Sequence, residues 1–274
     1  MLHIYKKSPI TVLSHFYNEE WLLPHWLNHH SRLFDHGILV NYGSTDNSVD
    51  IIKKITPNWT IVDSKNKMFD AELCDLEMME YERTVFGWKM ILNTTEFMLT
   101  NDLKSKLRRL EIKNISMIRS IGYQINDSNN EEPFDNNKPI IFQRFNGHLD
   151  KWRFRIAHNH PDGRYHVGRH FDTPALKINS YTNKWHENIP ISDDALYTLW
   201  YRFAPFKEQI PRKIQISEKI PDSDRDKGFA WNHWKINEQI LFSRWQSEIQ
   251  HCDDIRKISG IYKEYEKVKE MYER

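Results

Sequence analysis

The sequence predicts an α/β protein with a mostly parallel central sheet, flanking helices and a helical C-terminal portion. Two apolar runs of strand length, 10–14 and 38–40, alternate with segments whose apolar residues recur at helical spacing. Strand–helix–strand units of this kind build parallel sheets. A polar turn follows each run, at 18–20 after the first and at 41–48 after the second. Because ligands of open parallel sheets bind beyond the carboxyl ends of the strands, we expect both turns to border a binding site.

Composition narrows the class of protein. The 274 residues suffice for one large domain with an appendage, and 10 Trp, 12 Tyr and 14 Phe can supply a core. The formal net charge of +1 argues against a nucleic-acid partner. Two cysteines, Cys74 and Cys252, allow no disulfide framework or zinc finger, so a reducing compartment is the default. Without a signal-peptide pattern at 1–7 or an apolar run of about 18 residues, we expect a cytoplasmic enzyme with no membrane span.

Further elements are expected along the chain. Helix 68–88 is predicted because Phe69, Leu73, Met79 and Val85 fall roughly on one face. The other expected elements are a strand at 60–62, a strand at 88–92, a helix at 101–114, a strand at 115–125, a polar loop at 126–138, a strand at 175–178, and helices at 193–202, 206–216, 235–249 and 253–273. We expect a core at 1–180 and a helical extension at 181–274 packed on it.

Two motifs resemble the start of a known enzyme family. Residues 16–20 (FYNEE) and 43–48 (GSTDNS) are similar to the turns that end the first two strands of family-2-like glycosyltransferases of the GT-A fold. Those enzymes have an N-E-x turn and then a D-x-S-x-D-x-S/T turn. The resemblance covers about the first hundred residues. It implies a GT-A-like core that binds a UDP- or GDP-sugar and transfers a hexosyl or pentosyl unit to a hydroxyl of a carbohydrate acceptor, in glycan biosynthesis.

The chain departs from this family where the metal would bind. Similar enzymes read W-x-x-x-x-D-x-D-E-F, and this chain keeps Trp88, Glu96 and Phe97 but has Asn93 and Thr95 in place of the aspartates. Hard cations such as Mg²⁺ and Mn²⁺ prefer anionic oxygen ligands. Three readings stay open: the enzyme works without metal, Glu96 and histidines bind the metal, or the chain is inactive. A metal-independent enzyme would need cationic side chains at the leaving diphosphate.

A histidine-rich hairpin is the second candidate site. Residues 152–160 alternate like a strand, 161–163 (Pro-Asp-Gly) indicate a turn, and 164–171 fit a return strand. With a three-residue loop, one face would carry four histidines, His158, His160, His166 and His170. They could ligate a metal, line the diphosphate site together with nearby basic residues, or be packed histidines in an aromatic-rich sheet.

The resemblance and the residues together give a set of site predictions. The catalytic candidates are Asp162, His158 and Glu96, with Asp150 as a further candidate base. The candidates for donor binding are Asn18, Glu19, Glu20, Asn41, Tyr42, Asn93, Thr95, Lys151, Arg153 and Arg155. A metal, if present, would bind Glu96, His158 and His160.

Other functions remain as alternatives. A metal-dependent phosphoesterase or hydrolase could use the histidine cluster, and a catalytically inactive GT-A-like domain could bind glycans or a partner enzyme. The aromatic residues at 229–234 fit either sugar stacking or a core. The charged, amphipathic segment 253–273 is expected to be a packing arm or a homodimer contact.

Overall fold

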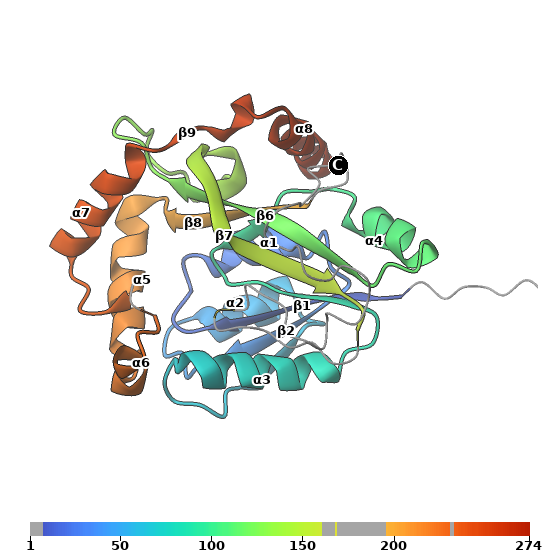
Figure 1. The fold of residues 1–274 in the computed structure, drawn as a ribbon, viewed down its shortest axis with the longest axis horizontal. Helices are drawn as coiled ribbons and strands as arrows, with labels where there is room; N and C mark the ends of the chain where they lie inside the picture. The colour runs from blue at the N-terminus through green and yellow to red at the C-terminus, as the bar shows by residue number, and fades with distance from the viewer. Residues whose placement is uncertain (1–7, 161–167, 169–195, 231–232) are drawn as a thin grey trace, which may run out of the picture.

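The computed structural model describes residues 8–160, 168, 196–230 and 233–274, and the side chains of 151–153 are not described. In this part of the chain, nine strands form one sheet in the order β3-β2-β1-β4-β7-β6-β8-β5, with β9 paired to β7 (Figure 1). The strands are β1 (Ile10–Phe16), β2 (His36–Asn41), β3 (Thr60–Asp63), β4 (Trp88–Ile91), β5 (Glu96–Met98), β6 (Met117–Asn126), β7 (Asn146–His158), β8 (Leu196–Phe203) and β9 (Asp253–Asp254).

Most strands of the sheet point the same way. Strand β1 pairs in parallel with β2 and β4, and β2 pairs in parallel with β3. Strand β7 is antiparallel to β4 and to β6, and β6 is parallel to β8, so β6 and β8 share the direction of the first four strands. Strand β5 is antiparallel to β8. The predicted α/β class with a mostly parallel sheet is confirmed.

Helices cover both faces of the sheet. The helices are α1 (Leu23–His30), α2 (Ser48–Ile55), α3 (Ala71–Arg83), α4 (Leu103–Ile112), α5 (Phe206–Glu218), α6 (Asp222–Asp226), α7 (Glu238–Ile249) and α8 (Ser259–Glu273), with 3₁₀ turns η1 (Ile140–Phe142) and η4 (Ile255–Lys257). Val12 packs on the face covered by α1, whereas its neighbour Leu13 packs on the face covered by α3. Both are fully buried, which explains why β1 is apolar on both faces.

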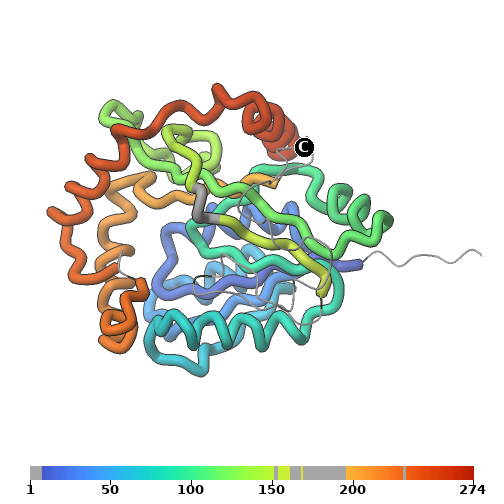
Figure 2. The backbone as a smooth tube through the Cα atoms, in the orientation of Figure 1, coloured from blue at the N-terminus to red at the C-terminus, as the bar shows by residue number. Residues whose placement is uncertain are grey.

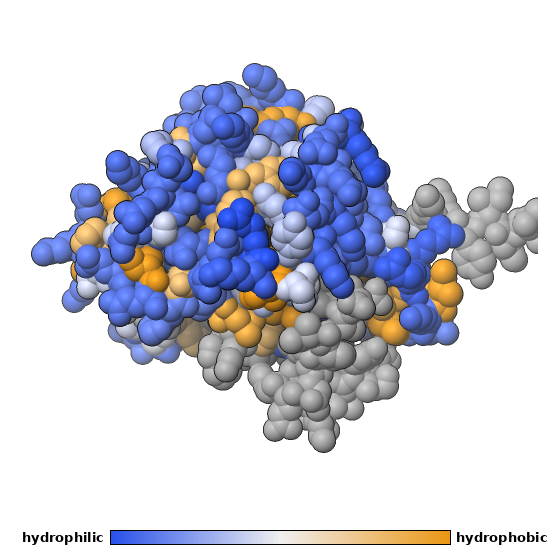
Figure 3. Space-filling view, turned by 90° about the horizontal axis from the view of Figure 1, so that it is seen from above, coloured by the Kyte–Doolittle hydropathy of each residue, from blue (hydrophilic) through white to orange (hydrophobic). Residues whose placement is uncertain are grey.

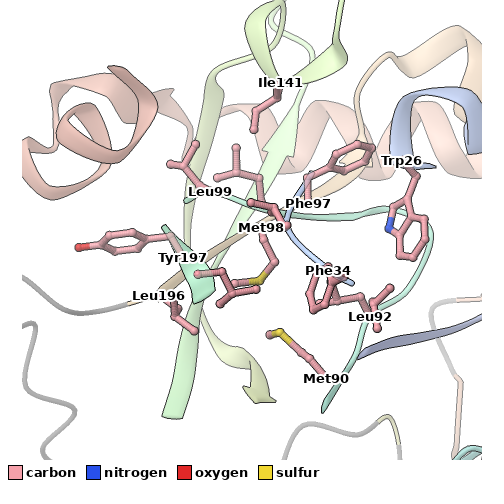
Figure 4. Packing of buried hydrophobic residues seen from close by; sticks show 14 of the residues in the cluster. Trp26, Phe34, Met90, Leu92, Phe97, Met98, Leu99, Ile141, Leu196 and Tyr197 are labelled. Atoms are coloured by element: carbon pink, nitrogen blue, oxygen red, sulfur yellow. The ribbon is translucent and has the colours of Figure 1, made fainter. Parts of the chain in front are cut away.

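The larger core cluster joins elements from the whole chain. Figure 4 shows Trp26 of α1, Phe34, Met90 of β4 and Phe97 of β5 gathered in one cluster with Tyr197 of β8. Because β8 belongs to this core, packing ties the last third of the chain to the first hundred residues.

The structure corrects one predicted element. Residues 193–202 were expected to form a helix, but Leu196–Phe203 form strand β8 between β6 and β5. A strand buried on both faces lacks polar–apolar alternation, and its apolar run cannot be told from a buried helix by periodicity alone. The predicted domain boundary at residue 180 and the predicted strand at 175–178 lie outside the described residues, while β8, beyond that boundary, is part of the sheet.

The C-terminal helix lies against the first part of the chain. The Lys106 amine of α4 lies 3.1 Å from a carboxylate oxygen of Glu264 of α8, and both residues are buried. The Tyr272 hydroxyl of α8 lies 2.9 Å from Nδ1 of His29 in α1. Figure 2 shows the chain returning in α8 beside α4 at the C-terminus. These contacts join α8 to α4 and to α1.

The surface seen in Figure 3 is mostly hydrophilic, with scattered apolar side chains. Within the described ranges, no helix has the length and apolar character needed to cross a bilayer.

Candidate functional site

A cavity of about 590 Å³ lies beyond the carboxyl ends of β1 and β4. From β1 the chain passes through α1 to β2 on one side, and later crosses to β4 on the other side. This reversal of strand order is where ligands bind in open α/β sheets. The residues that line this cavity include Tyr17, Glu19, Phe69, Asn93, Thr94, Thr95, Asp150, Trp200, Arg202, Arg212 and Lys213.

The two predicted turns hold each other in place beside this cavity. The side-chain oxygen of Asn18 accepts a hydrogen bond from the Thr45 amide at 2.8 Å, and the Asn18 amide donates to the Ser44 hydroxyl at 3.0 Å. The Glu20 carboxylate accepts hydrogen bonds from the backbone and side-chain nitrogens of Asn47. Asn18 has a positive φ of 49°, which an asparagine tolerates better than most residues. Asn18 and Glu20 therefore link the turns and are not among the residues that line the cavity.

Asn41 and Tyr42 also lie behind the cavity wall. The Asn41 amide bonds Asp63 at 3.1 Å, and its oxygen accepts from the Ser44 amide at 2.9 Å. The Tyr42 hydroxyl donates to Glu77 at 2.9 Å, and burial raises the pKa of this hydroxyl far above its usual range. Its ring stacks on Phe69 with the centroids 4.7 Å apart, and Phe69 faces the cavity.

The turn after β4 lines the cavity with neutral side chains. Asn93, Thr94 and Thr95 all contribute to the lining. The indole nitrogen of Trp26 donates to the backbone oxygens of Asn93 and Glu96, at 3.1 and 3.0 Å. These bonds fix the turn from below, so its side chains have a defined position at the end of β4.

Glu96 and Arg155 form an ion pair in the interior. Both side chains are at most 1 % exposed, and Nε and Nη2 of Arg155 each lie 2.6 Å from a different carboxylate oxygen of Glu96. The Asn93 amide donates to the same carboxylate at 2.8 Å. Neither residue is among those that line the cavity. The structure brings these two predicted site residues together, but as a brace under the 93–96 turn.

Glu19 and Arg212 form a second ion pair, and this one borders the cavity. Nε of Arg212 lies 2.8 Å from each carboxylate oxygen of Glu19, and Nη2 lies 2.7 Å from one of them. The Thr94 hydroxyl donates to the same carboxylate at 2.9 Å and lies 3.4 Å from Nη2 of Arg212. Helix α5 thus places a guanidinium group directly at the 93–95 turn.

The opposite wall comes from β7 and β8. Asp150 of β7 aligns with Gly122 of β6, which aligns in turn with Thr198 of β8. Trp200 and Arg202 of β8 line the cavity with Asp150. The Arg202 side chain is held by Gln124 at 2.8 Å and by Glu248 of α7 at 2.6 Å.

Helix α5 is fixed at its start by a buried carboxylate. Asp127 accepts a hydrogen bond from the Phe206 amide at 2.7 Å and another from Nε of Arg144 at 2.8 Å. Burial raises the pKa of Asp127 to about 6. Beyond the end of α5, Asp224 of α6 accepts a hydrogen bond from the Ala71 amide of α3 at 2.9 Å. These contacts set the position of Arg212 relative to β1 and β4.

The described histidines of the predicted hairpin do not line the cavity. His158 is fully buried at the end of β7, where Nε2 lies 2.8 Å from a Glu82 carboxylate oxygen of α3. His158 and His160 are not among the cavity-lining residues, and strand β7 pairs with β6 and β4. Asp162, His166 and His170 lie outside the described residues, as do the side chains of Lys151 and Arg153. Across the described ranges, no group of three or more His, Cys, Asp or Glu residues could hold a metal ion.

Several cavity residues were absent from the sequence predictions. Arg212, Lys213, Trp200 and Arg202 all line the cavity but lie more than a hundred residues after the motif turns. The one available signal was chemical. The sequence analysis expected cationic side chains in an enzyme that lacks the two aspartates, and the adjacent Arg212 and Lys213 lie in the helix predicted at 206–216.

Comparisons with known proteins give only structural matches of low score and low identity. No family model matches the chain, and no curated protein matches it. Among solved structures, S. aureus TarS 1-349 in complex with UDP is similar with a TM-score of 0.35 and 14 % identity, over 46 % of this chain and 38 % of that one. Glucosyl-3-phosphoglycerate synthase from Mycobacterium tuberculosis, in complex with Mn²⁺, UDP and glucosyl-3-phosphoglycerate, is similar with a TM-score of 0.30 and 15 % identity, over 42 % of this chain and 44 % of that one. The similarity thus spans less than half of each chain.

Proposed function

We propose that this protein is a glycosyltransferase with a GT-A-like core that transfers a sugar from a nucleotide-sugar donor to an acceptor hydroxyl. The observation that carries the proposal is the position of the cavity, at the strand-order reversal between β1 and β4. Both of its borders at that point, the turn beginning at Tyr17 and the turn at 93–95, belong to the motifs that resemble the family.

The donor would occupy the side of the cavity formed by β1, α3 and α5. Tyr17 and Phe69 contact each other edge to face with centroids 6.2 Å apart, and both line the cavity, so they offer an aromatic surface for a nucleobase. Asn93 and Thr95 offer neutral hydrogen-bonding groups toward the diphosphate and sugar. A UDP- or GDP-sugar fits this combination of an aromatic end and a polar end.

The acceptor would occupy the side formed by β7 and β8. Among the candidates for the catalytic base, Asp150 is a cavity-lining carboxylate, whereas His158 bonds Glu82 in the interior and Asp162 lies outside the described residues. In an inverting displacement, the oxygen of the acceptor hydroxyl would form a bond to the anomeric carbon of the donor sugar. Asp150 would accept the proton that this hydroxyl loses. The bond from that carbon to the diphosphate breaks, and the nucleoside diphosphate leaves. Trp200 would pack against the acceptor ring.

The test is a transfer assay with a panel of UDP- and GDP-sugars and simple glycoside acceptors. We expect turnover with one donor, and Asp150→Asn should lower kcat by about 10²–10⁴ while leaving donor binding in place. Asp253→Asn is the matched control, because Asp253 is exposed on β9 and is not among the residues that line the cavity.

Other outcomes would select the alternatives. Donor binding with no transfer under any condition would indicate an inactive binding domain. Hydrolysis of phosphate esters without any sugar acceptor, lost when His158 is replaced, would indicate the hydrolase.

A further inference from the structure

The residues around the 93–96 turn do not fit the divalent metal that the family resemblance implies. Asn93 and Thr95 are neutral, whereas Mg²⁺ and Mn²⁺ favour carboxylate ligands. The one acidic residue of this turn, Glu96, is fully buried, and its two oxygens bond Arg155 and the Asn93 amide. Using Glu96 as a metal ligand would break its buried ion pair with Arg155, which is unfavourable.

A cation from the protein occupies this region instead. Arg212 reaches the 93–95 turn through its contacts with Glu19 and Thr94, and its side chain is 15 % exposed where it borders the cavity. The Nε and Nη2 atoms of Arg212 make its contacts with Glu19 and Thr94. Within the described part of the chain, Nη1 has no hydrogen-bond partner, so two N–H donors remain for a ligand. Lys213, the next residue, also lines the cavity.

We propose that Arg212, supported by Lys213, binds the donor diphosphate in place of a divalent cation. This inference rests on the proposed function. A guanidinium group is always charged and has the planar geometry that phosphate oxygens bind. As the bond between the sugar and the diphosphate breaks, negative charge increases on the leaving phosphate, and a fixed cation stabilises that charge.

Glu19 sets the strength of this site. Its carboxylate neutralises Arg212 when the cavity contains no anion, and its bonds to Nε and Nη2 orient the guanidinium group. Removing the negative charge while keeping a hydrogen-bond acceptor, as in Glu19→Gln, should therefore strengthen diphosphate binding. A purely structural Glu19–Arg212 pair predicts no such gain.

The experiment measures the affinities of UDP, GDP and uridine by calorimetry in EDTA and again with Mn²⁺. We expect the wild type to bind one of the two diphosphates in EDTA with an affinity that Mn²⁺ changes little. Arg212→Gln should weaken that diphosphate by about tenfold or more, since a charge-assisted hydrogen bond is lost, and should leave nucleoside affinity nearly unchanged. Arg212→Lys should recover part of the loss, and Glu19→Gln should tighten diphosphate binding severalfold.

Two further variants keep the result interpretable. Lys207→Gln removes an exposed positive charge from the same helix, and diphosphate affinity should stay at the wild-type value. If Arg212→Gln fails to fold because Glu19 is left buried and unpaired, the Glu19→Gln/Arg212→Gln double variant removes both charges together and should show the same loss of diphosphate binding.

The outcomes separate this inference from the function itself. Diphosphate binding that requires Mn²⁺ would overturn the metal-free site but retain the glycosyltransferase. Binding in EDTA that Arg212→Gln leaves intact would overturn the role of Arg212. No binding of either diphosphate under any condition would overturn the inference together with the proposed function.

Discussion

Two arginine–glutamate pairs flank the same short turn, and they differ in what surrounds them. Glu96–Arg155 lies under the 93–96 turn with at most 1 % of either side chain exposed. Glu19–Arg212 lies above it, where the arginine is 15 % exposed and borders the cavity. The sealed pair can only hold the backbone in place. The open pair leaves Nη1 of Arg212 for a ligand, because this nitrogen has no hydrogen-bond partner among the described residues.

The comparison shows that residue type and motif position do not by themselves identify a binding residue. Glu96 lies in the 88–97 segment that resembles the family motif and Arg155 lies in β7, yet the structure pairs them in the interior. Arg212 belongs to no motif and lies at the cavity. Burial distinguishes a cation that stabilises the fold from one that can meet a substrate.

The largest expected effect comes from breaking the sealed pair. Arg155→Met removes the guanidinium group that bonds both oxygens of the buried Glu96 carboxylate, so the free energy of unfolding should fall by about 3–5 kcal/mol. Urea denaturation measures this loss. The Glu96→Gln/Arg155→Met double variant should recover most of it, because both charges of the pair are removed together. A single variant within about 1 kcal/mol of the wild type would contradict the structural role.

A second large effect is the loss of stability at acid pH that the buried His29 causes. His29 is 1 % exposed, and burial lowers its pKa to about 4, from 6.5 in an unfolded chain. The folded protein favours the neutral imidazole of His29, whereas the unfolded chain binds a proton at this residue below pH 6.5. The stability of the folded protein is therefore highest above pH 6.5 and decreases as the pH falls toward 4. This loss is about 3 kcal/mol. Denaturation across this range should show a smaller acid-side loss in His29→Gln, while the exposed control His251→Gln should match the wild type.

Breaking the open pair should cost less stability than breaking the sealed one. Arg212→Gln leaves Glu19 without a cation, but the carboxylate keeps its hydrogen bond from Thr94 and water can enter from the cavity. We expect a loss of about 1–2 kcal/mol in the free energy of unfolding. A loss as large as that of Arg155→Met would mean that both pairs are equally sealed.

The smallest expected effect is the response to salt. Ions in the cavity screen an exposed charge, so raising the ionic strength should weaken diphosphate binding severalfold in the wild type and much less in Arg212→Gln. Calorimetric titrations at low and high salt test this difference. Equal salt dependence in both proteins would place the relevant charge elsewhere.

Local patterns predicted much of the fold. Apolar runs and turn residues indicated β1, β2, α3 and β6, because each of these segments carries its apolar pattern within its own residues. Strand β8 was missed, since a strand buried on both faces has no alternating pattern. The neighbours that bury β8 come from distant parts of the chain, so its burial could not be predicted from the residues around it.

The site divides in the same way. Glu19, Asn93 and Thr95 were predicted from motif turns and line the cavity. The pairing of Glu96 with Arg155 depends on the register of β7, and the approach of Arg212 depends on where α5 docks. Both are tertiary contacts between residues at least 59 positions apart, to which local sequence patterns are blind.

The most direct test of the account is one thermal-unfolding experiment in EDTA, with and without the diphosphate that binds the wild type. At a hundredfold excess over its dissociation constant, that ligand should stabilise the wild type by about 2.7 kcal/mol. We expect Glu96→Gln/Arg155→Met to keep this stabilisation and Glu19→Gln/Arg212→Gln to lose it. The reverse result, with the sealed pair required for binding and the open pair dispensable, would contradict the account and return the diphosphate site to Glu96 and Arg155.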